Sequence, residues 1–281
     1  MAGRKLAIVM GLIFAGLCSP AQDAFGQAPI AFPGAEGFGA HAQGGRGGDV
    51  YHVSNLDDSG PGSLRHGIES MSGPRTVVFE VSGTIFLEDR LRITHPYLTI
   101  AGQTAPGDGI TLAQYPLDVA ASPVVVRYIR SRVGDNIVQR TDAVPIEAGS
   151  NIMIDHVSAS GAIDEVMSSQ SGDVDLLTIQ WSMITEALNE SHHEKGDHAY
   201  GGILGALRQS VHHNLYAHLK SRAPKVTWRR HCKVDFRNNV VYNWLINNSY
   251  DGASSYMNWV NNYLKSGPAT KDDVKHLSLI H

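Results

Sequence analysis

Cysteine is almost absent from this sequence of 281 residues, which contains only Cys18 and Cys232. Cys18 lies in an N-terminal segment that has the pattern of a removable export signal, so Cys232 is the single cysteine of the expected mature chain. An intrachain disulfide is therefore excluded in a protein that is expected to enter an oxidising compartment. The mature chain must be stabilised by its core, by backbone hydrogen bonds or by bound metal.

The sequence also lacks an excess of positive charge and, beyond its N-terminus, a long hydrophobic run. Its net charge of -4 excludes a general nucleic-acid binder with a dominant basic face. Arg4 and Lys5 precede an apolar run, Leu6 to Cys18, which is too short to span a membrane and is typical of a secretory signal. We therefore predict a signal peptide at residues 1–27 and a single domain at residues 28–281. This domain is expected to be secreted (extracellular or periplasmic) and monomeric, with no nucleic-acid or membrane partner.

Short apolar or alternating runs, rather than long amphipathic helices, recur along the chain. From Val124 onward their starts are separated by roughly 22 to 33 residues, with clusters of Gly, Asn, Ser and Asp between them. Each run is a strand signal, so the repeat predicts an all-β solenoid in which every coil buries its inward side chains against the next. The runs are Thr76–Val81, Tyr97–Ala101, Val124–Ile129, Asn151–Ile154, Leu176–Trp181, Gln209–Leu215, Lys233–Tyr242 and Tyr256–Tyr263.

Asparagine recurs at comparable places in three successive runs. Stacked asparagines at a coil bend can bond to one another and to turn backbone, so the repeat predicts an asparagine ladder. Its members are expected at His213-Asn214, Asn238-Asn239 and Asn261-Asn262.

The Gly-rich N-terminal third contains one candidate helix, from Ser63 to Ser70, with Ser63 as its cap. A solenoid needs such a cap because an open end exposes apolar core and unpaired strand edges. We expect this helix to close the first end.

Seven segments follow one another between about Ala31 and about Tyr250: "GAEGFGAHAQGGRGGDVYHVSNLDDSGPGSLRHGI", "PRTVVFEVSGTIFL", "LTIAGQTAPGDGITL", "VVVRYIRSRVGD", "NIMIDHVSASGAIDE", "LLTIQWSMI" and "SRAPK". In this order they resemble the pectate lyases of polysaccharide lyase family one. The resemblance implies a right-handed parallel β-helix and a secreted enzyme. It also implies an acidic polysaccharide substrate, pectate or polygalacturonate, cleaved at 4-linked uronates by calcium-assisted β-elimination.

β-Elimination removes the proton on C5 of a uronate, beside its carboxylate, and expels the oxygen on C4. A hard divalent cation with oxygen ligands can neutralise that carboxylate. The resemblance places Ca²⁺ at Asp142 and Glu165, and Asp164 is a further candidate ligand. The neighbouring pair Asp155-His156 is expected to tie coils together by hydrogen bonds instead.

Arg222, in "SRAPK", matches the arginine that the family assigns as the base for the C5 proton. A guanidinium is almost always protonated, so a second role stays open, as an electrostatic partner of the enolate-like intermediate. The predicted substrate-binding residues are Lys195, His198, Tyr200 and Lys225.

Four positions depart from the family pattern. Arg140 and Ser169 stand where further acidic ligands are expected. Tyr200 replaces a substrate-binding lysine, for which Lys195 or His198 can substitute, and Thr227 replaces a second arginine. The residues that can supply this second charge are Lys225, Arg229 and Arg230.

Two smaller clusters admit more than one interpretation. His192, His193 and His198 form either a transition-metal site or a polar groove lining, of which the lining is favoured. The larger aromatic residues can stack on sugars but are expected mainly in the core or between coils. They are Trp181, Trp228, Tyr242, Trp244 and Trp259.

Two rival functions remain at this stage. A β-helical polygalacturonase would hydrolyse the polymer with an acid and a base, and Asp164-Glu165 is the only close acidic pair in the middle coils. The other clustered aspartates of that hydrolase family are missing from this sequence. The second rival is a carbohydrate-binding β-helix, or a truncated lyase fragment, that has lost catalysis, and the four departures favour it.

Overall fold

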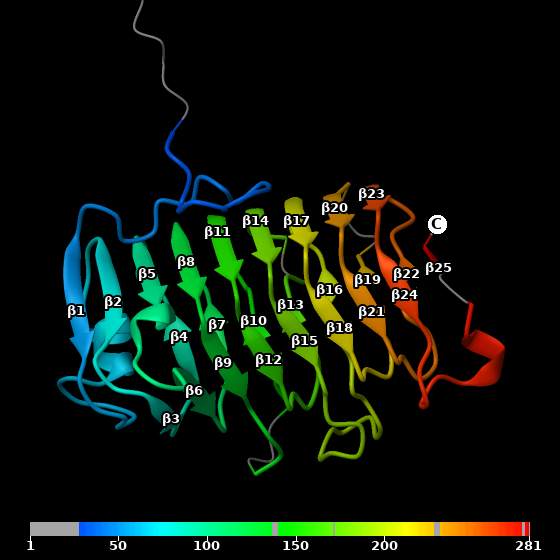
Figure 1. Cartoon of the computed structure of the whole chain (residues 1–281), viewed down its shortest axis with the longest axis horizontal. Coiled ribbons are helices and arrows are strands. Elements are labelled where there is room, and N and C mark those ends of the chain that lie inside the picture. The colour runs from blue at the N-terminus through cyan, green and yellow to red at the C-terminus, as the bar shows by residue number, and fades with distance from the viewer. Residues whose placement is uncertain (1–27, 137–139, 171, 228–230, 277–278, 281) are drawn as a thin grey trace, which may run out of the picture.

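Parallel strands wind around a common core and build three sheets that run the length of the molecule (Figure 1). The computed structural model describes residues 28–136, 140–170, 172–227, 231–276 and 279–280. The predicted signal peptide lies outside these ranges. Within them, no helix is long and apolar enough to cross a bilayer. The all-β parallel solenoid expected from the repeat is confirmed.

The first sheet has nine strands and contains the core of every predicted run. All its pairings are parallel, for example Ile152 beside Val124 on one side and Leu177 on the other. Its strands are β1 (Asp49–Val53), β2 (Arg75–Phe79), β5 (Leu98–Ala101), β8 (Val124–Arg127), β11 (Gly149–Asp155), β14 (Val174–Gln180), β17 (Arg208–His212), β20 (Lys233–Arg237) and β23 (Tyr256–Val260).

From β8 onward, the second sheet follows the first after a sharp bend of one or two residues. Several runs expected to be single strands are therefore two: Gln209–Leu215 breaks at His213, which has a φ of 56°. The strands of this sheet are β3 (Gly83–Phe86), β6 (Ile110–Ala113), β9 (Ile129–Arg132), β12 (Ser158–Ser160), β15 (Met183–Thr185), β18 (Leu215–Ala217), β21 (Val240–Tyr242) and β24 (Tyr263–Lys265).

The third sheet consists of very short strands that the sequence analysis missed. Isolated bridges, Val119 with Ile146 and Ser169 with Leu204, join its pieces into one face. Its strands are β4 (Leu91–Ile93), β7 (Leu117–Val119), β10 (Val144–Pro145), β13 (Met167–Ser168), β16 (Ile203–Leu204), β19 (Lys225–Val226), β22 (Tyr250–Asp251) and β25 (Leu279–Ile280).

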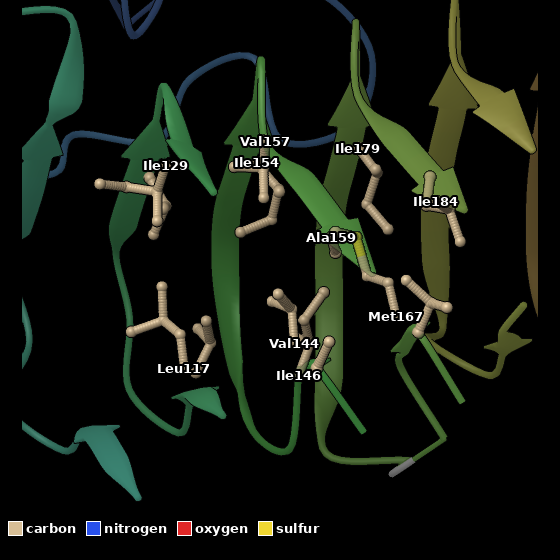
Figure 2. Packing of buried hydrophobic residues seen from close by; sticks show 14 of the residues in the cluster. Leu117, Ile129, Val144, Ile146, Ile154, Val157, Ala159, Met167, Ile179 and Ile184 are labelled. Atoms are coloured by element: carbon tan, nitrogen blue, oxygen red, sulfur yellow. The ribbon is translucent and has the colours of Figure 1, made fainter. Parts of the chain in front are cut away.

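Aliphatic side chains from all three sheets meet inside the coils. Figure 2 shows Leu117 and Val144 of the third sheet facing Ile129 of the second and Ile154 of the first. These four side chains are at most 1% exposed. Like residues stack on like from coil to coil, so burial on one coil depends on the next.

The predicted N-terminal cap is confirmed, although it is shorter than expected. The helix η1 spans His66–Ser70, and Ser63 Oγ accepts the backbone N–H of His66 at 3.2 Å. Leu64 and Ile68 join the main core cluster at the first end. The buried Arg75 guanidinium donates to the carbonyl oxygen of Ile68 at 2.8 Å, which ties the helix to β2. Two further short helices are η2 (Gly102–Thr104) and η3 (Asp272–Val274).

Residues 31–48 form a strap across the outer face of the first sheet (Figure 1). Gly39 donates its N–H to Thr178 Oγ1 at 2.9 Å, and Gly45 donates to Thr99 Oγ1 at 2.9 Å. A Cβ on Gly39 would lie 2.2 Å from the Ile152 carbonyl oxygen, so only glycine allows this approach. The strap covers one face and leaves the third sheet open.

The asparagine ladder is present at the bend between the first and second sheets. Asn214 Nδ2 donates to Asn239 Oδ1, and Asn239 Nδ2 donates to Asn262 Oδ1, each at 3.1 Å. Ser182 continues the column, because its N–H donates to Asn214 Oδ1 at 2.8 Å. Outside this column, Asn261 Nδ2 donates to Asn238 Oδ1 at 2.7 Å. The ladder fixes the register of successive coils and hence the positions of their loops.

Candidate active site

The loops that lead from the second sheet into the third carry the predicted site residues. Asp142 lies just before β10, Glu165 just before β13, Tyr200 just before β16 and Arg222 just before β19. Bridges join Glu165 to Tyr200 and Tyr200 to Ser221 in parallel register. Successive coils therefore bring residues that are far apart in sequence to one edge of the third sheet.

Three carboxylates meet at this edge. Asp142, Asp164 and Glu165 each offer an oxygen atom within 4.8 Å of the others. Asp142 Oδ1 accepts the backbone N–H of Glu165 at 3.2 Å, and Asp164 Oδ2 accepts Nε of Arg140 at 2.5 Å. Asp164 and Glu165 are each only 5% exposed. The chain therefore concentrates negative charge where little water can screen it.

This crowding raises the pKa of Asp142, first because its carboxylate is buried and second because of the charge on Asp164. A positive charge placed among the three groups would relieve both penalties. An oxygen-only donor set suits a hard cation such as Ca²⁺. The residues predicted to bind calcium therefore fit that ion, with Asp142, Asp164 and Glu165 as the groups that would hold it.

Arg222 is held beside the carboxylates by contacts with three other coils. Its Nη1 pairs with Glu165 Oε1, and its Nε donates to the Tyr250 hydroxyl at 3.2 Å. Its Cζ lies 4.1 Å from the centroid of the Tyr200 ring. A cation fixed between a carboxylate, a phenol and an aromatic face has few alternative positions.

The loop of residues 186–202 adds two histidines but not a third. His198 Nε2 lies 2.7 Å from Asp164 Oδ1, and His193 Nε2 lies 3.6 Å from the same atom. Burial lowers the pKa of His198 despite the opposing charge of Asp164. His192 points elsewhere, with Nδ1 2.9 Å from Asp135 Oδ1, so it does not join the other two histidines, whereas His193, His198 and Asp164 each offer a ligand atom within 4.8 Å of the others.

A groove of about 400 Å³ opens beside Asp142 and Asp164 on the third sheet. Arg90 and Glu147 line one part of it, and Arg140, Asp142 and Asp164 line another. The groove therefore joins guanidinium groups and carboxylates in one open space. Such a lining suits a polar, charged polymer better than an apolar ligand.

Curated proteins from two moulds are similar to this chain over most of its length. It is 44% identical over 245 residues to a probable pectate lyase C of Emericella nidulans, a match that covers 86% of this chain and 54% of that protein. It is 45% identical over 256 residues to a probable pectate lyase C of Aspergillus flavus, covering 88% and 57% respectively. The chain is a homologue of pectate lyases. It spans little more than half the length of these relatives.

A solved pectate lyase structure has the same fold. This structure, from a study of substrate specificity and anti β-elimination, aligns with a TM-score of 0.65 and 16% sequence identity, covering 91% of this chain and 84% of that one. At 16% sequence identity, this similarity shows a shared fold. No protein-family model matches the chain.

Two departures from the pectate lyase pattern have a local structural explanation. Ser169 is fully buried, and its Oγ donates to Gln209 Oε1 at 2.8 Å, so this position does not face the groove. Arg140 neutralises Asp164 directly. In the described structure an intramolecular cation therefore occupies a position where the family pattern led us to expect a further acid.

The remaining predicted substrate-binding residues differ in their exposure and in the groups that they contact. Tyr200 lies under Arg222, and Lys225, on the same sheet, has its Nζ 3.9 Å from Asp251 Oδ2. Lys195 is exposed in the loop, and its backbone N–H bonds His193 Nδ1. Arg229 and Arg230, considered as substitutes for the second arginine, lie outside the described residues.

Asp155 has the structural role expected of it. It accepts Arg127 Nε at 2.7 Å and Gln180 Nε2 at 2.8 Å, and His156 Nδ1 is 3.0 Å from it. Arg127 and Gln180 come from the strands on either side of Asp155 in the first sheet, so the group ties coils together.

The aromatic residues also behave mainly as expected. Trp244 is in the core, and Trp259 stacks on Phe236 with ring centroids 4.5 Å apart. Trp181 is half exposed and stacks on His213 at 4.3 Å. Tyr242 packs edge-on against His218, and Trp228 lies outside the described residues.

Sequence reasoning missed Tyr250 and the partner role of Arg140. Tyr250 lies in β22, in register with Lys225 of β19. That register was the only signal that could have found it. It was hidden because each of these strands is two residues long.

Proposed function

We propose that the chain is a secreted polysaccharide lyase that cleaves 4-linked uronan, pectate or polygalacturonate, by calcium-assisted β-elimination. The single observation that carries this proposal is the position of the Arg222 guanidinium, fixed beside the cluster of Asp142, Asp164 and Glu165. The named pectate lyases of similar sequence support the same activity.

The residues divide between holding charge and moving a proton. When bound by the three carboxylates, Ca²⁺ would supply a Lewis acid that neutralises the uronate carboxylate next to C5. Arg222 takes the C5 proton, the C–H electron pair becomes the C4–C5 double bond, and the C4–O bond breaks so that the departing sugar oxygen leaves and gains a proton from water. A guanidinium must first lose a proton to take this role.

Tyr200 and Tyr250 hold Arg222 beside Glu165 through the ring face and the hydroxyl group. Lys225 lies next to Tyr250 on the third sheet, and in this proposal it binds the carboxylate of a neighbouring uronate. Arg140 and Arg90 at the groove can do the same for residues farther along the polymer.

The proposal is tested by incubating the purified chain with polygalacturonate in calcium and, separately, with a chelator. We expect an unsaturated product that absorbs in the near ultraviolet, lost with chelator and restored by added calcium. New reducing ends without that absorbance would instead indicate hydrolysis. Calcium-dependent retention on the polymer without any product would indicate a binding protein.

A further inference from the structure

Two buried histidines stand behind the carboxylate cluster, and the proposed reaction does not use them directly. The side chains of His193 and His198 are 0% and 7% exposed. Their rings are stacked, with centroids 3.8 Å apart and an interplanar angle of 11°. His198 also packs against the Tyr200 ring at 4.1 Å. Two imidazoles buried this closely must have a defined hydrogen-bonding role or they would destabilise the fold.

The surroundings of His193 determine which of its nitrogens carries the hydrogen. Its Nδ1 accepts the backbone N–H of Lys195 at 3.0 Å. A neutral imidazole that accepts at Nδ1 carries its hydrogen on Nε2. That Nε2 has no hydrogen-bond partner within the described residues and lies 3.6 Å from Asp164 Oδ1. His193 therefore directs an N–H toward Asp164.

The same geometry argues against a metal ion shared by the two histidines and Asp164. A metal bound to an imidazole nitrogen lies close to the plane of the ring, along the lone pair. Two nearly parallel rings separated by 3.8 Å cannot both satisfy that requirement for one ion. The hydrogen on His193 Nε2 also occupies the position that a metal would need. The pair is arranged to donate hydrogen bonds.

We propose that His198, against which His193 stacks, is a positioning residue that holds the Asp164 carboxylate correctly oriented for a cation shared with Asp142 and Glu165. This inference rests on the proposed function, from which the identity of the cation as Ca²⁺ is taken. His198 donates to Oδ1 at 2.7 Å, while Arg140 donates to Oδ2 at 2.5 Å. Both oxygens are thus restrained, from opposite sides.

Asp164 keeps the capacity to bind a cation under these restraints. A carboxylate has about four lone-pair positions, and the donors from His198 and Arg140 account for two. Without the His198 donor, the buried carboxylate would lose its shortest neutral partner and could rotate toward Arg140. Partners of this kind behind metal ligands change metal affinity by about 10- to 100-fold when they are removed.

The test measures calcium affinity by titration calorimetry in matched variants. His198→Phe keeps the stacked ring and removes the N–H, whereas His198→Gln loses the ring and keeps an amide N–H at a similar reach. We expect His198→Phe to weaken calcium binding by about 10-fold or more and His198→Gln to restore most of it. His192→Ala, in the same loop but paired with Asp135, is the control and should bind as the wild type does.

Equal calcium affinity for His198→Phe and the wild type would overturn the inference, as would equal losses in His198→Phe and His198→Gln. Circular dichroism checks folding. Should His198→Phe not fold, His193→Asn replaces it, because its Oδ1 can still accept the Lys195 N–H while the Nε2 donor is gone. A measurable but smaller loss is then expected, and an unchanged affinity contradicts the proposal.

The two proposals fail in distinguishable ways. Calcium binding that depends on His198, without unsaturated product from the wild type, would refute the lyase activity alone. Product formation by the wild type, with calcium affinity independent of His198, would refute the positioning role alone. A wild type that binds no calcium contradicts both.

Discussion

Arg222 shows how one side chain depends on several coils. Its partners Glu165, Tyr200 and Tyr250 precede or belong to strands β13, β16 and β22, so no local segment positions it. The side chain is 20% exposed, which leaves it accessible to solvent while its charge stays paired. A short or uncharged replacement would lose all three contacts.

We expect Arg222→Ala to abolish lyase activity, lowering the rate by at least about 100-fold, because both the base and the cation are lost. The fold should persist because the residue lies outside the core. Product absorbance and thermal unfolding measure the two effects. Arg208→Ala, which removes an exposed arginine paired with Asp175 on the first sheet, is the matched control. A near-normal rate in Arg222→Ala would show that another group takes the proton.

Asp118 gives a pH-dependent prediction. Its side chain is fully buried, and burial raises its pKa to about 6 although Arg90 Nε, 3.0 Å away, opposes the shift. The folded state thus binds this proton more tightly than the unfolded state does. The stability it contributes is present below about pH 4 and is lost as the pH rises through about 6.

Asp118→Asn cannot ionise, so it should gain stability over the wild type as the pH rises. The difference in free energy of unfolding is expected to grow by about 3 kcal/mol between about pH 4 and pH 7. Denaturant unfolding in the presence of chelator measures it. The exposed Asp57→Asn should show no such trend, and a constant difference for Asp118→Asn would mean that its carboxyl titrates normally when folded.

At the scale of secondary structure, the bend between the first and second sheets is held by repeated asparagine hydrogen bonds. Asn214, Asn239 and Asn262 each donate to a backbone carbonyl of the preceding coil, at 2.9 to 3.0 Å, as well as to or from one another. This double use explains why asparagine repeats there, since it offers two donors and an acceptor on a short side chain.

Asn239→Ala should therefore destabilise the fold by about 2 kcal/mol, because it leaves buried groups on both neighbouring coils without partners. Chemical denaturation measures the loss. Asn261→Gly, at the exposed neighbouring column, keeps a residue suited to its φ of 54° and should cost much less. Equal effects of the two substitutions would argue against the ladder as the source of the stability.

The strands of the first sheet could be predicted because they are four to seven residues long and carry apolar residues, which in some strands alternate between buried and less buried positions. In β2, for instance, Arg75, Val77 and Phe79 are buried while Thr76 and Val78 are half-buried. The two-residue strands of the third sheet carry no periodicity of their own. They exist only because neighbouring coils align them, and they escaped prediction for that reason.

At the scale of the whole molecule, a cation would act as a link between loops of different coils. Asp142 and Glu165 are 23 residues apart in the chain and belong to successive coils. An ion bound by both stabilises the folded chain, because the unfolded chain does not hold these groups together.

Calcium should therefore raise the free energy of unfolding by about 2.7 kcal/mol when its free concentration is about 100 times the dissociation constant. Asp142→Asn is expected to reduce this gain strongly. Thermal unfolding with calcium and with chelator measures the effect. Asp175→Asn, on the first sheet, should keep the full response, and an equal response of the wild type and Asp142→Asn would place the ion elsewhere.

The sequence by itself determined the parallel solenoid, the asparagine ladder and the likeness to pectate lyases, because these depend on patterns that repeat or persist along the chain. It also singled out Asp142, Asp164, Glu165 and Arg222 as residues of interest. The tertiary structure alone decided that Arg140 and His198 hold Asp164, that His192 stands apart and that Ser169 faces the interior. These outcomes depend on the register between coils and on side-chain direction in loops, and residues 20 to 60 positions apart carry no local signal of either.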